Sequence, residues 1–266
     1  MQDLKIDFTV TNKILDSPYT KLLFNLLGKY SNKLFIVGGA IRDSFLFGYN
    51  SNYDVDFVVN EQIKDINKYI NLHLQEKQFN NIKIDNTLLN YGVIRLNIED
   101  KIYDITMFRN DFYKYGSRYP IVKYTNSIIE DSKRRDFTVN AIYLNKNNEL
   151  FDPTDNGIED LKNKRIRFIL DSRKDNNINS GILRRIVEDP LRIVRYIRIY
   201  LKFFPDFTYN IGLNKDIYLL DLCANFLQKI IAYDKETINI LLDNIKLLKL
   251  INENKLKSEI NKIFIK

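Results

Sequence analysis

Two aspartates separated by one residue, Asp54 and Asp56, are the residues of this sequence whose spacing most directly indicates chemistry. On an extended strand, residues two apart project from the same face, so both carboxylates would meet on one side. Two such carboxylates repel each other unless a cation lies between them, and hard oxygen ligands favour Mg²⁺ or Mn²⁺. Asp104, expected on a neighbouring strand, is a candidate third carboxylate.

A glycine pair precedes these carboxylates, at the predicted junction of a strand and a helix. Gly38 and Gly39 leave backbone N–H groups uncovered at the helix N-terminus, where an anion is favoured. Arg42 follows one turn later and can add charge-assisted hydrogen bonds to phosphate oxygens. A lone Gly-Gly pair is usually only a turn, and a lone Asp-x-Asp pair is often a solvated surface pair. The order of the two features along the chain favours a nucleotide site.

Two further segments combine arginines with acidic residues. The run from Arg134 to Ala141 sets two arginines beside Asp136, a pattern that can hold a guanidinium toward a triphosphate or a base. The alternative is a surface ion pair with a capping aspartate. The second segment is Glu188-Asp189-Pro190-Leu191-Arg192, continued by Arg195 and Arg198, which aligns acceptors and donors along a helix. Its alternative is a solvated helix face that carries ion pairs.

The hydrophobic pattern predicts the elements that must position these residues. Short apolar strands are expected at 34–37, 53–59, 91–98 and 102–108, helices at 18–30, 40–47 and 190–201, and a loop at 175–181. This order predicts an α+β fold with a small mixed sheet and flanking helices. We expect a catalytic head over residues 1–145, a helical neck over 146–205 and a short helical segment over 206–266.

Composition excludes several classes of protein. A single cysteine, Cys223, rules out an intramolecular disulfide framework, and a single histidine, His73, argues against a multi-histidine metal centre. The formal net charge of +7 favours polyanionic partners, nucleic acid before a membrane surface. No apolar run is long enough to span a membrane. Asp3 and Asp7 precede any apolar stretch, so we expect a cytosolic protein, or an organellar one if a leader has been removed.

Taken in order, the motifs resemble those of the class II tRNA nucleotidyltransferases, which comprise CCA-adding enzymes, CC- and A-adding relatives and bacterial poly(A) polymerases. The resemblance covers about residues 31–202. It rests on Gly38-Gly39-x-x-Arg42-Asp43 with Asp54-x-Asp56, on Arg134-Arg135-Asp136-Phe137-Thr138-x-Asn140-Ala141, on Asp152-Pro153 with Gly157 and Asp160-Leu161, and on Glu188-Asp189-Pro190-Leu191-Arg192. Asn156 stands where the family commonly has glycine, and we expect the turn to form because asparagine tolerates positive φ.

The resemblance implies a head with two metal-binding aspartates, Asp54 and Asp56, and a neck that selects the nucleotide without a nucleic-acid template. Asp189 and Arg192 would read the base edge of CTP or ATP. The residues expected to bind the nucleotide or steady its pocket are Gly38, Gly39, Arg42, Asp43, Arg135, Asp136, Asn140, Glu188, Asp189, Arg192, Arg195 and Arg198. The stretch 109–120, with Arg109, Asp111 and Arg118, resembles the mobile loop of CCA-adding members.

The resulting hypothesis is attack of an RNA 3′-hydroxyl, most simply that of tRNA, on the α-phosphate of CTP or ATP, assisted by two Mg²⁺ ions at Asp54 and Asp56. Asp104 is expected to help the attacking hydroxyl. Three alternatives stay open: poly(A) polymerase or CC- or A-only addition, a small-molecule nucleotidyltransferase, and a non-catalytic RNA-binding protein. With only residues 206–266 after the neck, we expect a reduced grip on tRNA.

Overall fold

The computed structural model describes residues 9–114 and 117–203, which form two compact units. The first comprises residues 9–112 and 121–169, and the second residues 113–114, 117–120 and 170–203. The first unit combines a sheet with helices, so the predicted α+β class is confirmed. The predicted boundaries at 145 and 205 stay predictions, and the predicted helical segment 206–266, with Cys223, lies outside the described residues.

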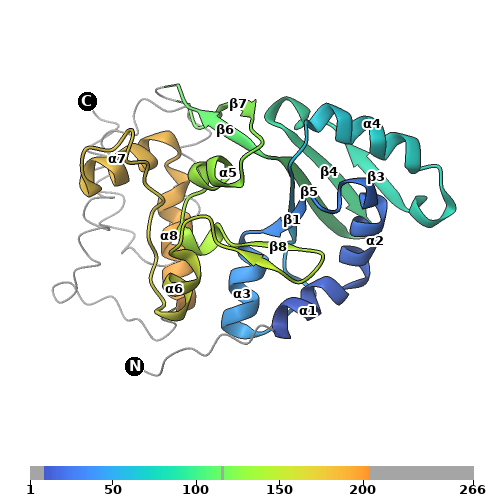
Figure 1. Cartoon of the computed structure of the whole chain (residues 1–266), viewed down its shortest axis with the longest axis horizontal. Coiled ribbons are helices and arrows are strands. Elements are labelled where there is room, and N and C mark those ends of the chain that lie inside the picture. Colours follow the sequence, from blue (N-terminus) through green and yellow to red (C-terminus); the bar gives the residue numbers. More distant parts are fainter. Residues whose placement is uncertain (1–8, 115–116, 204–266) are drawn as a thin grey trace, which may run out of the picture. The chain divides into compact units, whose positions relative to one another are not determined.

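The first unit contains both strands and helices, whereas the regular elements of the described part of the second unit are helices (Figure 1). The strands are β1 (Leu34–Val37), β2 (Asp56–Val59), β3 (Ile82–Asp85), β4 (Val93–Ile98), β5 (Lys101–Met107), β6 (Arg109–Phe112), β7 (Ile121–Tyr124), β8 (Tyr143–Asn145) and β9 (Leu150–Phe151). The α-helices are α1 (Thr9–Asp16), α2 (Pro18–Leu26), α3 (Gly39–Phe47), α4 (Ile63–His73), α5 (Ile128–Arg134), α6 (Gly157–Lys162), α7 (Ile178–Glu188) and α8 (Leu191–Phe203). Short 3₁₀ turns are η1 (Gly28–Tyr30), η2 (Lys77–Phe79), η3 (Leu89–Tyr91) and η4 (Thr138–Asn140).

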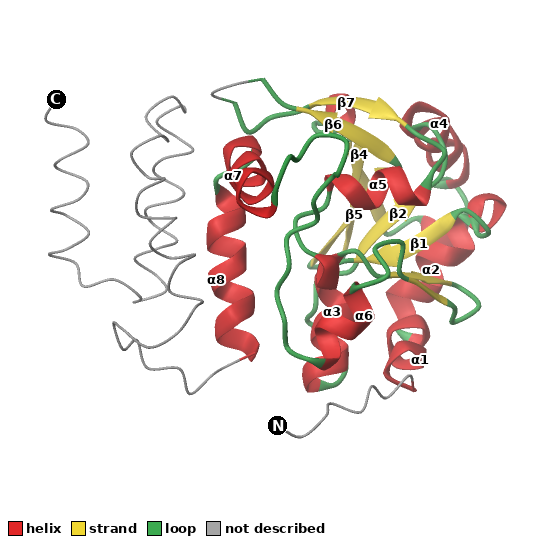
Figure 2. Ribbon diagram, turned by 60° about the vertical axis from the view of Figure 1, so that its left-hand side comes forward, coloured by secondary structure: helices red, strands yellow, loops and turns green. Residues whose placement is uncertain are grey.

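The main sheet places β2 at its centre, in the order β3-β4-β5-β2-β1-β8-β9. Figure 2 labels its central strands β4, β5, β2 and β1. β2 pairs antiparallel with β1, so that Asp56 lies beside Val37, and parallel with β5, so that Phe57 lies beside Ile105. The other pairings of this sheet are antiparallel, and β6 and β7 form a separate hairpin. From Phe57 to Val59 the central strand is buried. Asp56, its first residue, therefore lies where the buried part of the sheet ends.

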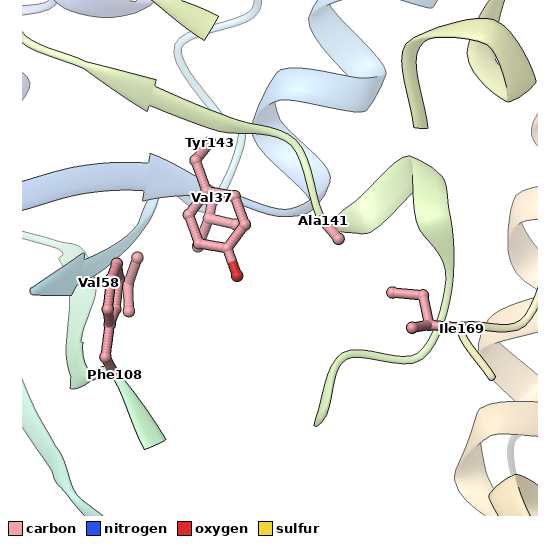
Figure 3. Packing of buried hydrophobic residues seen from close by; sticks show 6 residues of the cluster. All are labelled: Val37, Val58, Phe108, Ala141, Tyr143 and Ile169. Carbon is pink, nitrogen blue, oxygen red and sulfur yellow. The ribbon is translucent and has the colours of Figure 1, made fainter. Parts of the chain in front are cut away.

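One part of the apolar core lies beside the site residues. Strands β1, β2 and β8 contribute three of its residues, and the segments after β5, before β8 and after α6 contribute the others (Figure 3). The six residues are Val37, Val58, Tyr143, Phe108, Ala141 and Ile169. Tyr143 is fully buried but carries a hydroxyl, which needs a polar partner inside the core. The core therefore includes a polar group that the hydrophobic effect alone does not explain.

Three predicted elements differ from the observed ones. The helix expected over 18–30 ends at Leu26, and Gly28–Tyr30 form the separate 3₁₀ turn η1. The strand expected from residue 53 begins only at Asp56, because the segment before it is irregular. The loop expected over 175–181 is wrong in its second half, because α7 begins at Ile178. Asn177 caps this helix by accepting a hydrogen bond from the Ser180 N–H, while the Ser180 hydroxyl accepts one from the Asn177 N–H. None of the described helices has the length and apolar character to cross a bilayer.

Candidate active site

The glycine pair forms the predicted turn between β1, which ends at Val37, and α3, which begins at Gly39. Gly38 has a φ of +93°, which L side chains rarely adopt, so glycine is required by the backbone. A Cβ built on Gly38 would lie 3.5 Å from Oδ2 of Asp56. The turn therefore brings its backbone against one of the carboxylates predicted to bind metal.

Arg42 and Asp43 lie in the first half of α3 and are both buried. Arg42 donates from Nε to Asp43 Oδ1 at 2.8 Å and from Nη1 to Asn140 Oδ1 at 2.5 Å. Asn140 donates from Nδ2 to Asp136 Oδ1 at 2.9 Å. A Cβ at Gly39 would lie 3.5 Å from Arg42 Nη2. One hydrogen-bonded chain thus joins the glycine-pair motif to the Arg-Arg-Asp motif, which the sequence predicted only as separate features.

The three candidate carboxylates lie close to one another at the start of β2. Asp54 precedes the strand instead of lying within it, so the same-face geometry expected for one strand does not apply. The parallel pairing of β2 with β5 begins at Phe57 and Ile105, so Asp56 and Asp104 each stand one residue before it on neighbouring strands. Asp104 accepts two hydrogen bonds from Arg95, at 2.8 Å from Nε and 2.9 Å from Nη2. Asp104 is therefore held rigidly by a guanidinium, whereas the carboxylates of Asp54 and Asp56 have no hydrogen bond to the described residues.

The pKa of Asp56 is raised to about 6. Burial of the carboxyl among protein atoms is the main cause, and the negative charges of Asp104 and Asp54 act in the same direction. The charges of Arg135 and Arg134 act in the opposite direction without outweighing these effects. The side chain still keeps water-accessible surface, so solvent screening reduces the energetic effect. The negative charge of Asp56 is thus only partly balanced by the protein.

This donor set fits a magnesium site completed by substrate. Mg²⁺ usually binds through one or two carboxylates, several waters and the phosphates of its substrate. Asp54 and Asp56 provide the two carboxylates, and no group of three or more His, Cys, Asp or Glu side chains that could hold a metal lies in residues 9–114 and 117–203. A bound cation would also balance the negative charge of Asp56, which burial disfavours, and would so lower the pKa of this carboxyl.

A buried aspartate that the sequence analysis did not select holds the arginine pair. Asp131, on α5, has no exposed surface and accepts hydrogen bonds from Arg134 Nε at 2.8 Å and Arg135 Nη2 at 3.2 Å. The Tyr143 hydroxyl donates to Asp131 at 2.7 Å and accepts from Arg135 Nε at 2.9 Å. The spacings of three and four residues were the signal available in the sequence. Arg134 and Arg135 are therefore directed by Asp131 and Tyr143.

The predicted mobile-loop residues belong in part to a β-hairpin. Arg109 and Asp111 lie in β6, where Arg109 Nε donates to Asp111 at 2.9 Å. Oδ2 of Asp111 also lies 3.9 Å from Nη1 of Arg134. Burial, together with the charge of Arg134, lowers the pKa of Arg109. Arg118 lies between β6 and β7, where its guanidinium stacks on Tyr119 at 4.5 Å from the ring centroid.

In the second unit, Glu188 connects three arginines. Its Oε2 accepts from Arg185 Nη1 at 2.7 Å and from Arg192 Nη1 at 2.8 Å, and its Oε1 accepts from Arg184. Burial alone would raise the pKa of Glu188, but the arginine charges outweigh it, so the pKa is lowered. Glu188 is the last residue of α7, and it also precedes α8, which begins at Leu191, one residue after the position that the sequence predicted.

The remaining predicted residues of this unit lie in α8 or directly before it. Asp189 Oδ2 accepts from Arg195 Nη2 at 2.6 Å. Arg192 is 2% exposed and donates from Nη2 to the Tyr113 hydroxyl at 3.4 Å. Arg198 lies exposed on α8. The predicted residues thus form two groups, one within each unit.

The Asn156-Gly157 turn forms as expected, but positive φ is adopted by Asp155, at 53°, and not by Asn156, at −133°. A Cβ on Gly157 would lie 2.6 Å from the carbonyl oxygen of Thr138. Glycine is therefore required at 157 by the close approach of two backbone segments, whereas position 156 has no such requirement.

Comparisons with known proteins agree with the motifs. The Poly A polymerase head domain family model matches residues 34–167. The human protein CCA tRNA nucleotidyltransferase 1, mitochondrial, is 33% identical over 183 residues, which are 68% of this chain and 37% of that protein. The chain therefore spans well under half the length of this curated relative.

Two solved structures share the fold. The Bacillus stearothermophilus CCA-adding enzyme in complex with CTP superposes with a TM-score of 0.55 at 23% identity, covering 85% of this chain and 49% of that one. A tRNA nucleotidyltransferase complexed with a primer tRNA and an incoming ATP analog superposes with a TM-score of 0.54 at 24% identity. The superposition covers 87% of this chain and 59% of that one. The matched family model, which spans half of the sequence, and the human relative show that the chain belongs to the family of tRNA nucleotidyltransferases and poly(A) polymerases defined by the Poly A polymerase head domain.

Proposed function

We propose that this protein is a template-independent nucleotidyltransferase that adds CMP and AMP, from CTP and ATP, to the 3′ end of tRNA. The observation that carries the proposal is the grouping at the start of β2. There the Gly38 turn, the carboxylates of Asp54 and Asp56 and the arginine pair at 134–135 combine a phosphate-type turn, metal ligands and cations. The names of the relatives, which mention CCA addition, CTP, an ATP analog and tRNA, support the choice of substrates.

In the proposed reaction, the 3′-hydroxyl of the RNA attacks the nucleotide α-phosphate, a new phosphodiester bond forms and pyrophosphate leaves. Mg²⁺ bound by Asp54 and Asp56 supplies activation of the hydroxyl and neutralisation of the phosphate charge. Arg42 and Arg135 bind phosphate oxygens of the nucleotide through charge-assisted hydrogen bonds. Asp104, fixed by its pairing with Arg95, adds negative potential beside Asp56 and so favours cation binding there.

Nucleotide choice is assigned to the neck. Asp189 supplies acceptors and Arg192 supplies donors for the edge of the base, and Glu188 orients Arg192 through its 2.8 Å contact. A site that hydrogen-bonds a base rejects a base without the matching groups because its own buried polar groups are then left unpaired. Arg195 keeps Asp189 oriented through the 2.6 Å ion pair.

The test is an incorporation assay with the full chain, Mg²⁺ and tRNA transcripts that end before, within and after the C-C-A tail, with each NTP supplied singly. We expect C addition to the shortened transcript and A addition to the transcript that ends in C-C. The matched variants are Asp54→Ala, expected to be inactive, and Asp100→Asn, which changes an exposed carboxylate in the β4–β5 turn and is expected to keep full activity.

The other outcomes of this assay are equally specific. Repeated A addition to any RNA would make the protein a poly(A) polymerase, and addition of C alone or A alone would make it a partial CCA-adding enzyme. Binding of tRNA without incorporation of any nucleotide would make it a non-catalytic RNA-binding protein. Normal incorporation by Asp54→Ala would refute the assignment of the carboxylates. The cytosolic location stays a prediction, since the name of the human relative places that protein in mitochondria.

A further inference from the structure

Asp131 uses all of its hydrogen-bonding capacity inside the first unit. A carboxylate has about four lone-pair sites. At Asp131, Oδ1 accepts from Arg134 Nε at 2.8 Å and from the Arg109 backbone N–H at 3.1 Å. Oδ2 accepts from the Tyr143 hydroxyl at 2.7 Å and from Arg135 Nη2 at 3.2 Å. This fully satisfied, fully buried carboxylate therefore determines where four groups from three parts of the chain lie.

The orientation of Arg135 is fixed twice, once by Asp131 and once by Tyr143. The Tyr143 hydroxyl accepts from Arg135 Nε at 2.9 Å while it donates to Asp131, and the guanidinium lies over the Tyr143 ring at 5.1 Å from its centroid. The three groups form a closed triangle of hydrogen bonds. A guanidinium held in this way loses little conformational freedom when it binds a phosphate, which is the benefit of preorganisation.

The charges of this cluster also favour a role at the site. Asp131 carries one negative charge and the arginine pair carries two positive charges, which leaves a net charge of +1 next to Asp56. Burial acts to raise the pKa of Asp131, but Arg134 and Arg135 outweigh it, so the pKa is lowered and the carboxylate stays ionised. Asp131 therefore makes the burial of two adjacent arginines possible while leaving positive charge for a phosphate.

The Asp131 carboxylate also contacts the base of the hairpin formed by β6 and β7. Arg109, whose N–H it accepts, is the first residue of β6, and it follows Phe108 of the apolar core. The backbone at the base of the hairpin and the arginine pair therefore share one anchor. A displacement of either one changes the hydrogen bonds available to the other.

We infer that Asp131 is a positioning residue for nucleotide binding: it acts through Arg135, with the Tyr143 hydroxyl as the second support, and sets the guanidinium that holds the triphosphate. The inference rests on the proposed function for the identity of the ligand. It predicts a loss of nucleotide affinity in variants that leave the fold and the metal carboxylates intact.

The chain offers a matched control in Asp160, which also has no exposed surface. The Asp160 carboxylate accepts from the Thr138 hydroxyl at 2.6 Å and from Arg167 Nη2 at 2.9 Å, and Arg165 Nη1 lies 3.6 Å from its Oδ1. Its charge is not among the causes of the Asp56 pKa shift. Asp160→Asn therefore removes a buried, paired negative charge of the same unit without touching the arginine pair. The amide oxygen of the asparagine can still accept the hydrogen bond from the Thr138 hydroxyl, so the η4 turn that carries Asn140 keeps this contact.

The experiment measures the Kd of CTP and of ATP by calorimetry, and the KM and kcat of incorporation, in Asp131→Asn, Tyr143→Phe and Asp160→Asn. Loss of one charge-assisted contact is expected to raise Kd and KM of Asp131→Asn roughly tenfold, with a smaller change in kcat. Tyr143→Phe is also expected to raise Kd, but by a smaller factor than Asp131→Asn. Asp160→Asn is expected to lower the melting temperature and leave Kd unchanged.

A double-mutant cycle with Arg135→Ala separates positioning from simple destabilisation. If Asp131 acts through Arg135, the double variant binds nucleotide no more weakly than Arg135→Ala alone. Asp160→Asn leaves Kd unchanged both in the wild type and in Arg135→Ala. Additive losses in the Asp131–Arg135 cycle would overturn the inference, as would an unchanged Kd in Asp131→Asn.

If Asp131→Asn does not fold, Tyr143→Phe decides the question alone, with unchanged Kd as the refuting result. A wild-type protein that binds nucleotide but incorporates none would refute the proposed function, while the Kd ratios would still test the role of Asp131. A wild-type protein that binds neither CTP nor ATP would overturn both.

Discussion

Replacing Asp56 by asparagine is expected to stabilise the metal-free protein while abolishing its activity. The folded-state pKa of about 6 lies about two units above the ordinary value of 3.8. At about 1.4 kcal/mol per unit, this difference corresponds to at most about 3 kcal/mol of unfavourable energy for the ionised carboxylate. Because the side chain keeps water-accessible surface, screening reduces the expected effect to about 1 kcal/mol.

The direction in which stability changes with pH follows from whether the folded or the unfolded state binds the Asp56 proton more tightly. Asp56 binds its proton more tightly in the folded state, so the penalty is absent below about pH 4, grows between pH 4 and 6 and is complete above pH 6. Asp56→Asn should therefore raise the melting temperature by about 2–4 °C at pH 7.5 in EDTA and leave it unchanged near pH 4. Added Mg²⁺ should raise the melting temperature of the wild type but not that of the variant.

The assay is thermal unfolding followed by circular dichroism from pH 4 to 8, with and without Mg²⁺. Asp100→Asn is the control, because Asp100 lies exposed in the β4–β5 turn, and its melting curve should follow the wild type at every pH. A melting temperature of Asp56→Asn that falls at pH 7.5, or that differs from the wild type equally at pH 4 and pH 7.5, would refute the electrostatic reasoning.

Three further predictions concern the turn and the neck. Asp189→Ala and Arg192→Ala should relax the choice among CTP, ATP, GTP and UTP more than they slow incorporation; an even loss of rate with unchanged preference would count against base reading. Gly38→Ala should lower the free energy of unfolding, measured in urea, by about 1 kcal/mol or more, because φ at this position is +93°. Gly28→Ala should leave the free energy of unfolding unchanged, because nothing lies within 4 Å of a Cβ at Gly28. Glu188→Gln should lower the free energy of unfolding by about 1–3 kcal/mol, because three arginines lose a charged acceptor. An unchanged free energy of unfolding would contradict the role of Glu188 in connecting these arginines.

The local parts of the site could be predicted from the sequence. Four apolar residues from Leu34 to Val37 followed by two glycines predict a buried strand that ends in a turn, and the structure has both. The signal is strong because strand burial and positive φ each restrict residue type at single positions. The beginning of β2 was misplaced because alternation continues through Asp54, whereas the pairing with β1 includes only residues from Asp56 onward.

Contacts between distant segments could not be predicted. The hydrogen bond from Arg42 to Asn140 joins residues 98 positions apart, and no local pattern encodes such a pairing. Asp131 was overlooked because an acidic residue near arginines on a short helix is most often a surface pair, and only the tertiary fold shows that it is buried. The beginning of α7 was missed because Asn177 has the composition of a loop, while its role as a helix cap depends on the Ser180 backbone.

The close approach of Gly157 to the Thr138 carbonyl restricts how this gene can vary. Every missense change at the Gly157 codon adds at least a Cβ, which would overlap the carbonyl oxygen of the η4 turn. That turn carries Asn140, the partner of Arg42, so the disturbance would reach the β1–α3 junction from a helix that contains none of the predicted catalytic residues. An inherited substitution at Gly157 would therefore be expressed as an enzymatic defect, and its suppressors should map to residues 138–140.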